Sequence, residues 1–85
     1  MRSIHLVTPG LPSILVQPTT DWMRQAVHLY GDDGNLVGEQ IGWVERYDGG
    51  KQWKGFTRQG ALPFRRSRPD AARDVLREWR IRSQR

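Results

Sequence analysis

Two turn sequences constrain the middle of this chain more than any other feature. "DDGN" occupies positions 32–35 and "DGGK" positions 48–51, and Asp, Asn and Gly accept the positive φ angles of tight hairpin turns. Stretches rich in β-branched and aromatic residues, which favour strands, lie beside these turns at 26–30, 36–47 and 52–57. We therefore predict three antiparallel strands in a meander, and "ALPF" at 61–64 predicts a short fourth strand.

The longest of these stretches carries two further predictions. Strand alternation places Ile41, Trp43 and Tyr47 on one face. Gly38 and Gly42 lie inside the same stretch, and glycine within a strand is typical of a bulge or a bend.

Residues 20–30 can be interpreted in two ways. The segment fits a helix that is capped by Thr20 or Asp21 and ends at Gly31, because its apolar residues recur at spacings of three and four. Its β-branched and aromatic content next to "DDGN" favours a strand, which is the interpretation we prefer.

The C-terminal segment predicts an amphipathic helix. Ser67 is a suitable N-cap and Pro69 suits the first turn. One apolar stripe then recurs at helical spacing and consists of Ala72, Val75, Leu76 and Trp79. The predicted fold class is therefore α+β: a small antiparallel sheet of three to four strands, packed by one C-terminal helix.

Prolines interrupt the first twenty residues. Because proline cannot donate to a sheet ladder, the apolar runs at 4–7 and 14–16 are each expected to form at most an edge strand or an extended arm. We predict an extended N-terminal arm over residues 1–20 and a single sheet-plus-helix domain over residues 21–85. The arm is expected to lie along its own domain; the alternative is that it adds a strand to a protein partner or to a second copy in a homodimer.

The composition argues against most catalytic chemistry. The chain has no Cys and only two histidines, His5 and His28, and neither has a carboxylate at a metal-ligand spacing. No phosphate-binding loop, dinucleotide fingerprint or nucleophile elbow occurs. We expect no enzyme activity, no metal and no cofactor. The apolar start is too short for a signal peptide or a membrane span, so a cytoplasmic location without a membrane partner is expected.

Positive charge is concentrated in the second half of the chain. Residues 1–50 hold three Arg and six acidic residues, whereas residues 51–85 hold eleven Lys and Arg and three acidic residues, so the halves carry −3 and +8. Such an asymmetry attracts phosphates or acidic proteins. We predict a small non-enzymatic accessory or regulatory protein that binds nucleic acid, DNA rather than RNA. The predicted contact residues are Arg46, Lys51, Lys54, Arg58, Arg65, Arg66, Arg68, Arg73 and Arg77.

A protein-interaction function is the alternative hypothesis. In that case the basic surface, or the apolar arm, docks an acidic protein partner, as a small inhibitor does. Salt dependence separates the two hypotheses, because phosphate binding weakens steeply as salt rises.

Two stretches carry a resemblance to a known family. "WVERYDGGKQWKGF" at 43–56 and the R-x-D-A-A-x-x-x-L run at 68–76 resemble the arm-binding N-terminal domains of tyrosine recombinases and the related AP2-like DNA-binding domains. The resemblance implies that a three-stranded sheet enters the major groove, backed by one helix. Arg46, Lys51, Lys54 and Arg58 would then read DNA, and the C-terminal arginines would hold phosphates. The arm and the lack of a recombinase catalytic domain depart from that family.

The helical interpretation of residues 20–30 carries a different resemblance. It gives the order α-β-β-β-α, which is similar to a double-stranded-RNA-binding domain. The lysine-rich helix start of that family is absent here.

Overall fold

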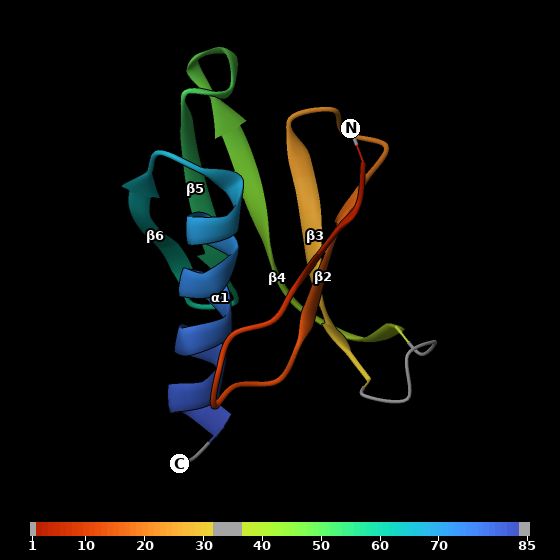
Figure 1. Cartoon of the computed structure of the whole chain (residues 1–85). Helices are drawn as coiled ribbons and strands as arrows, with labels where there is room; N and C mark the ends of the chain where they lie inside the picture. The colour runs from red at the N-terminus through yellow and green to blue at the C-terminus, as the bar shows by residue number, and fades with distance from the viewer. Residues whose placement is uncertain (1, 32–36, 84–85) are drawn as a thin grey trace.

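The computed structural model describes residues 2–31 and 37–83 as one antiparallel sheet and one α-helix (Figure 1). The elements in chain order are β1 (Ile4–Leu6), β2 (Ile14–Pro18), β3 (Arg24–Tyr30), β4 (Val37–Tyr47), a short 3-10 turn (Asp48–Gly50), β5 (Gln52–Thr57), β6 (Gly60–Arg65) and α1 (Arg68–Ser83). Strands that are neighbours in sequence are also neighbours in the sheet, in the order β1 to β6. The α+β class is confirmed, but the sheet has six strands where three to four were predicted.

The additional strands come from the first twenty residues. Ile14 and Val16 of β2 are fully buried, and they pair with Leu29 and Val27 of β3. β1 lies at the sheet edge as the sequence suggested, whereas β2 lies between β1 and β3. An inner position is open to β2 because its only proline, Pro18, is its last residue.

The segment before the first turn is a strand, so the preferred interpretation is confirmed and the helical one is wrong. The α-β-β-β-α order therefore does not apply to this chain. Five paired positions hold β3 against β2, from Ile14–Leu29 to Pro18–Gln25, and such pairing overrides a helical spacing of apolar residues. The predicted "DDGN" turn lies outside the described residues, and β3 and β4 flank it.

β4 contains the bulge that its glycines predicted. Val27 pairs with Gly42 but His28 pairs with Gln40, so Ile41 is an extra residue on β4. Ile41 is buried in the core, while Trp43 pairs with Phe56 on the other face. The prediction that Ile41 shares a face with Trp43 and Tyr47 is therefore wrong, because the bulge breaks the strict alternation.

The "DGGK" turn is confirmed as the connection between β4 and β5. Asp48, Gly49 and Gly50 all have positive φ angles, of 52°, 63° and 94°. The backbone N–H of Lys51 donates to the carbonyl oxygen of Asp48 over 3.1 Å and closes the turn. Three consecutive positive φ values explain why the turn is built from glycine and aspartate.

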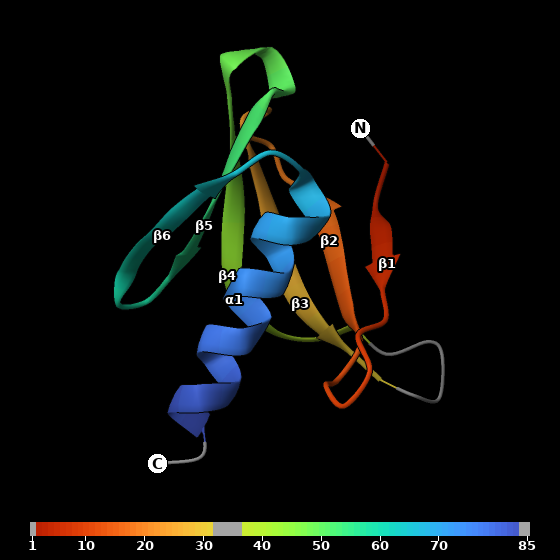
Figure 2. The ribbon, with the colours of Figure 1, turned by 60° about the vertical axis from the view of Figure 1, so that its left-hand side comes forward.

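α1 begins where the sequence predicted, and it covers one face of the sheet. The backbone N–H of Asp70 donates to the Ser67 hydroxyl oxygen over 3.2 Å, which is the predicted N-cap. The buried residues of the helix are Ala71, Ala72, Val75 and Leu76. They pack on β4, β5 and β6, so α1 crosses in front of the sheet in Figure 2.

Two glycines let α1 approach the sheet closely. A Cβ atom at Gly42 would lie 2.6 Å from Cγ1 of Val75, and one at Gly55 would lie 2.8 Å from Cγ2 of the same residue. The two methyl groups of Val75 therefore fill the space that a side chain on β4 or β5 would need.

No helix within residues 2–31 and 37–83 is long and apolar enough to cross a membrane.

Candidate functional site

The face of the sheet opposite α1 carries a cluster of aromatic and charged side chains. Residues paired directly across antiparallel strands project to the same side of the sheet. The pairs Trp43–Phe56, Arg24–Glu45, Glu45–Lys54 and Lys54–Phe64 therefore share a face, and the intervening Val44–Gly55 pair faces α1. We call this surface the open face, and it consists of Arg24, Trp43, Glu45, Tyr47, Lys54, Phe56 and Phe64.

The aromatic rings of the open face contact one another. Trp43 and Phe56 stack with their centroids 5.4 Å apart and their planes 3° apart. Tyr47 meets Phe64 edge-on, with centroids 5.3 Å apart and planes at 81°. The rings thus form two adjacent pairs that span β4, β5 and β6.

Two cations lie over these rings. The Arg24 guanidinium is 5.0 Å from the Trp43 ring centroid, and the Lys54 ammonium is 4.6 Å from that of Phe64 and 5.9 Å from that of Phe56. Cations over exposed rings are attracted by only about 0.5–1 kcal/mol each. Lys54 can therefore leave the rings at small cost when a ligand approaches, whereas Arg24 is also held by its ion pair with Glu45.

Glu45 lies among these groups as an ionised carboxylate. Arg24 Nη2 is 2.9 Å from Oε2 of Glu45, and the Tyr47 hydroxyl donates to Oε1 over 2.7 Å. Burial alone would raise the pKa of Glu45, but these hydrogen bonds and the charge of Arg24 outweigh burial and lower the pKa. The same hydrogen bond to Glu45, together with burial, raises the pKa of Tyr47.

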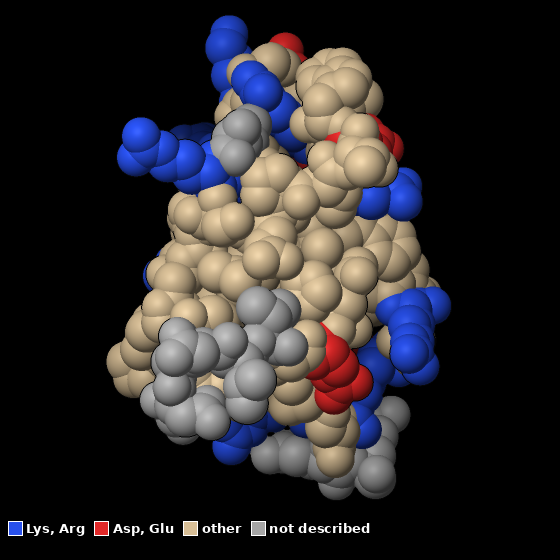
Figure 3. Space-filling model, turned by 90° about the vertical axis from the view of Figure 1, so that its right-hand side faces the viewer, with Lys and Arg blue, Asp and Glu red and all other residues tan. Residues whose placement is uncertain are grey.

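The open face is partly accessible to solvent. Phe64 is 50% exposed, and Trp22, in the turn between β2 and β3, is 76% exposed. Viewed from the side that carries β2 and β3 in Figure 1, the molecule shows a broad uncharged area, with Lys and Arg side chains and some Asp and Glu side chains around it (Figure 3).

Arg65 is the last residue of β6, and four more of the nine predicted contact residues lie along the same β5–β6 hairpin. Lys51 precedes β5, Lys54 lies within it, and Arg58 follows it in the turn to β6. Arg66 follows β6, and because the two strands are antiparallel it lies at the same end of the hairpin as Lys51. None of these four cations has a carboxylate partner within 4 Å among the described residues.

Three other predicted residues are engaged within the protein. Arg46 pairs with the buried Trp53, so it lies on the α1 side, and its guanidinium donates to the carbonyl of Gly49 over 3.0 Å. The family resemblance implied that Arg46 and Lys54 act on one surface, but the alternation of β4 and β5 puts them on opposite faces.

Arg65 and Arg68 connect α1 to the sheet. Arg65 makes two hydrogen bonds to Asp74 of α1, over 2.7 and 3.1 Å, and this carboxylate raises the pKa of Arg65. Arg68 donates to Oε1 of Gln25 over 2.9 Å and to the carbonyl of Arg2 over 3.0 Å, while burial lowers its pKa. Both side chains thus have structural contacts that compete with an external ligand.

Arg73 and Arg77 lie on α1, each paired with an acidic residue one turn earlier. Arg73 is 3.8 Å from Asp70, and Arg77 is 3.5 Å from Asp74. These surface pairs contribute little to stability. The structure separates both arginines from the open face, because α1 covers the other side of the sheet.

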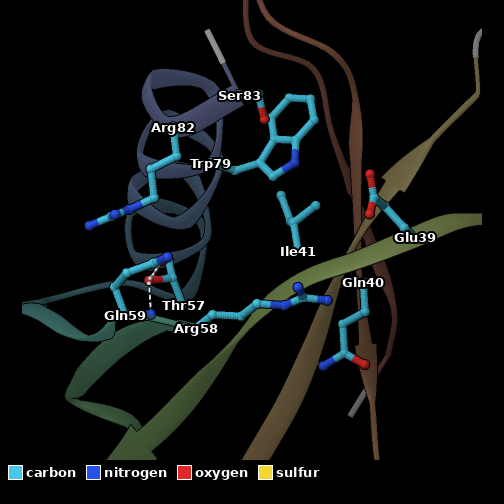
Figure 4. Close-up of a pocket in the computed structure, with 9 residues that line it drawn as sticks. All are labelled: Glu39, Gln40, Ile41, Thr57, Arg58, Gln59, Trp79, Arg82 and Ser83. Atoms are coloured by element: carbon cyan, nitrogen blue, oxygen red, sulfur yellow. Dashed lines mark hydrogen bonds between the residues drawn. The ribbon is translucent and has the colours of Figure 1, made fainter. Parts of the chain in front are cut away.

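A groove of about 220 Å³ opens where the C-terminal end of α1 approaches β4 and β5. Figure 4 shows Trp79 of α1 facing Ile41, with Arg58 extending across the opening towards Gln40. The lining combines an indole with polar groups but contains no histidine or cysteine. Within the described part of the chain, no group of three His, Cys, Asp or Glu side chains could hold a metal ion.

Sequence reasoning placed Tyr47 on one face with Trp43, but it missed Arg24 and Phe64 as members of the same surface. The alternation of Trp43, Glu45 and Tyr47 in the sequence was a signal for such a face. The bulge removes Ile41 from that face, and the strand register was needed to bring in Arg24 and Phe64.

Comparison with known proteins gives no relative from which a function could be transferred: no family model, no curated protein and no solved structure matches this chain.

Proposed function

We propose that this protein binds nucleic acid, with DNA as the expected partner, and that it acts as an accessory or regulatory protein rather than as an enzyme. The contact surface in this proposal is the open face together with the cations of the β5–β6 hairpin. The resemblance to AP2-like domains agrees with a sheet that contacts DNA, although the set of contact residues differs from the one it implied.

One observation carries this proposal: four cations that have no acidic partner among residues 2–31 and 37–83 lie along the hairpin that forms part of the open face. They are Lys51, Lys54, Arg58 and Arg66. A cation paired with a protein carboxylate must break that pair to bind phosphate, whereas an unpaired one releases only solvent and counterions. The hairpin cations are therefore better placed for phosphate contacts than Arg65, Arg73 or Arg77.

The test is a titration of labelled duplex DNA, single-stranded DNA and duplex RNA with the protein, measured by fluorescence anisotropy at several salt concentrations. If phosphates are contacted, the logarithm of the affinity falls linearly with the logarithm of salt, with a slope of roughly 0.7–0.9 per phosphate neutralised. Replacing Arg66 with Gln should weaken binding and reduce that slope by about one.

Arg82→Gln is the matched control for Arg66→Gln. It removes the same charge at the far end of α1, where Arg82 pairs with Glu78 over 3.0 Å. We expect Arg82→Gln to change the affinity much less than Arg66→Gln. Absence of binding to all three nucleic acids at low salt would refute the proposal and favour an acidic protein as the partner.

A further inference from the structure

From the open face we infer the form of nucleic acid that the protein prefers: an unpaired strand whose bases stack on Phe64 and on the Trp43–Phe56 pair. This inference rests on the proposed function, because it requires that nucleic acid binds at all. It goes further by selecting single-stranded over duplex nucleic acid.

The chemistry of the open face favours stacking over groove contacts. Four of its seven side chains are aromatic: Trp43, Tyr47, Phe56 and Phe64. Aromatic rings bind the faces of bases, and those faces are available only in an unpaired strand. Reading the major groove requires instead side chains that donate to and accept from base edges.

The charges on the open face also disfavour a duplex. The carboxylate of Glu45 lies at the centre of the row Arg24–Glu45–Lys54–Phe64 and faces outward with the other members of that row. A duplex pressed against this surface would bring phosphates of two strands close to that negative charge. A single strand can place its bases over the rings and direct its phosphates towards the border of the sheet, away from Glu45.

Lys54 and Arg24 are positioned to support such a strand. In the free protein they lie over the rings of Phe64 and Trp43, at 4.6 and 5.0 Å. Base stacking on aromatic rings is stronger than an exposed cation–π contact, so a base that arrives at Phe64 displaces Lys54, whereas Arg24 also keeps its ion pair with Glu45. The displaced side chain stays within reach of the neighbouring phosphate. Phe64 is the most accessible of these rings, because half of its surface is exposed.

The experiment compares labelled oligothymidylate with a duplex of the same length, using the full chain and its Phe64→Leu variant. Leucine keeps an apolar side chain at this position but removes the ring. We expect the wild-type protein to bind the single strand more tightly than the duplex. We expect Phe64→Leu to weaken single-strand binding by about five- to a hundredfold, the range that corresponds to loss of one stacked base.

Ile81→Ala is the matched control, because Ile81 is 53% exposed on α1, on the other side of the sheet. Its affinity for the single strand should remain that of the wild type, and circular dichroism verifies that both variants are folded. Equal or tighter binding of the duplex, or unchanged binding by Phe64→Leu, would overturn the stacking inference while leaving nucleic-acid binding in place. Failure to bind either oligonucleotide at low salt would overturn both.

Discussion

The close approach of α1 to the sheet makes Gly55 sensitive to the addition of a single methyl group. In Gly55→Ala the new Cβ would lie 2.8 Å from Cγ2 of Val75 and 2.9 Å from the carbonyl oxygen of Ala71. Ordinary non-bonded contacts are about 3.5–4.0 Å, so α1 must shift outward, at a cost of roughly 1–3 kcal/mol. Loss of glycine's freedom in the unfolded chain offsets about 0.4–1 kcal/mol. We expect a net destabilisation of about 1–2 kcal/mol.

A double-mutant cycle assigns this cost to the helix. Val75→Ala alone removes two buried methyl groups, worth about 0.8 kcal/mol each before any cavity cost, so we expect it to destabilise by roughly 2 kcal/mol. In the double variant the methyl group that collides with the new Cβ is absent. The combined loss should therefore fall short of the sum of the single losses by at least about 0.5 kcal/mol.

Urea unfolding followed by circular dichroism measures these differences, and about 1 kcal/mol corresponds to roughly 4–8 °C in melting temperature for a chain of this size. Gly38→Ala is the control: a Cβ there would approach Leu29 and no atom of α1, so we expect no coupling to Val75→Ala. Additive effects of Gly55→Ala and Val75→Ala would mean that α1 does not lie over β5, and the assignment of the open face would fail with it.

Three further predictions concern single side chains. Arg68→Met should lower the free energy of unfolding by about 1–3 kcal/mol because it removes the donor to the buried Gln25, whereas Arg66→Met should change it by less than about 0.5 kcal/mol; chemical denaturation compares the two. Because the pKa of Glu45 is lowered by folding, its contribution to stability is present above the ordinary glutamate pKa and is lost as the pH falls through the lowered value. Glu45→Gln should therefore lose less stability than the wild type on acidification, and equal losses in pH-dependent melting would contradict this. Ser67→Ala should cost about 1 kcal/mol through loss of the N-cap of α1, and an unchanged melting temperature would argue against that cap.

The parts of this fold that depend on local chemistry could be predicted from the sequence. The N-cap at Ser67 and the apolar stripe of α1 follow from helix geometry, and the turn at 48–51 follows from residues that accept positive φ. The strands that flank the turn were predicted to within a few residues for the same reason. Each of these features is encoded within a dozen neighbouring residues.

The features that were missed depend on contacts between distant segments. β2 became an inner strand because Ile14 and Val16 pair with residues of β3, which proline positions alone could not reveal. Ile41 is an extra residue on β4, so its side chain lies in the core and not on the face of Trp43, where strict strand alternation had placed it.

The candidate site depended on such contacts as well. The composition indicated a basic surface, but only the structure separates the arginines that hold α1, such as Arg65 and Arg68, from cations such as Arg66, which has no acidic partner in the part of the chain that the structure describes. The open face could be recognised only from the register of four strands, because its residues are spread along the sequence between Arg24 and Phe64.

The central claim is that the open face, and not α1, contacts nucleic acid, and the four tryptophans provide a direct test. Their indole N–H groups report on different places: Trp43 on the open face, Trp22 in the β2–β3 turn, Trp53 in the core and Trp79 in the groove beside α1. We would titrate isotope-labelled protein with oligothymidylate and follow these four signals by NMR, assigned through single Trp→Phe variants. We predict that the Trp43 signal shifts strongly while that of the buried Trp53 stays in place. Shifts confined to Trp79 and the backbone of α1, with Trp43 unchanged, would contradict the claim.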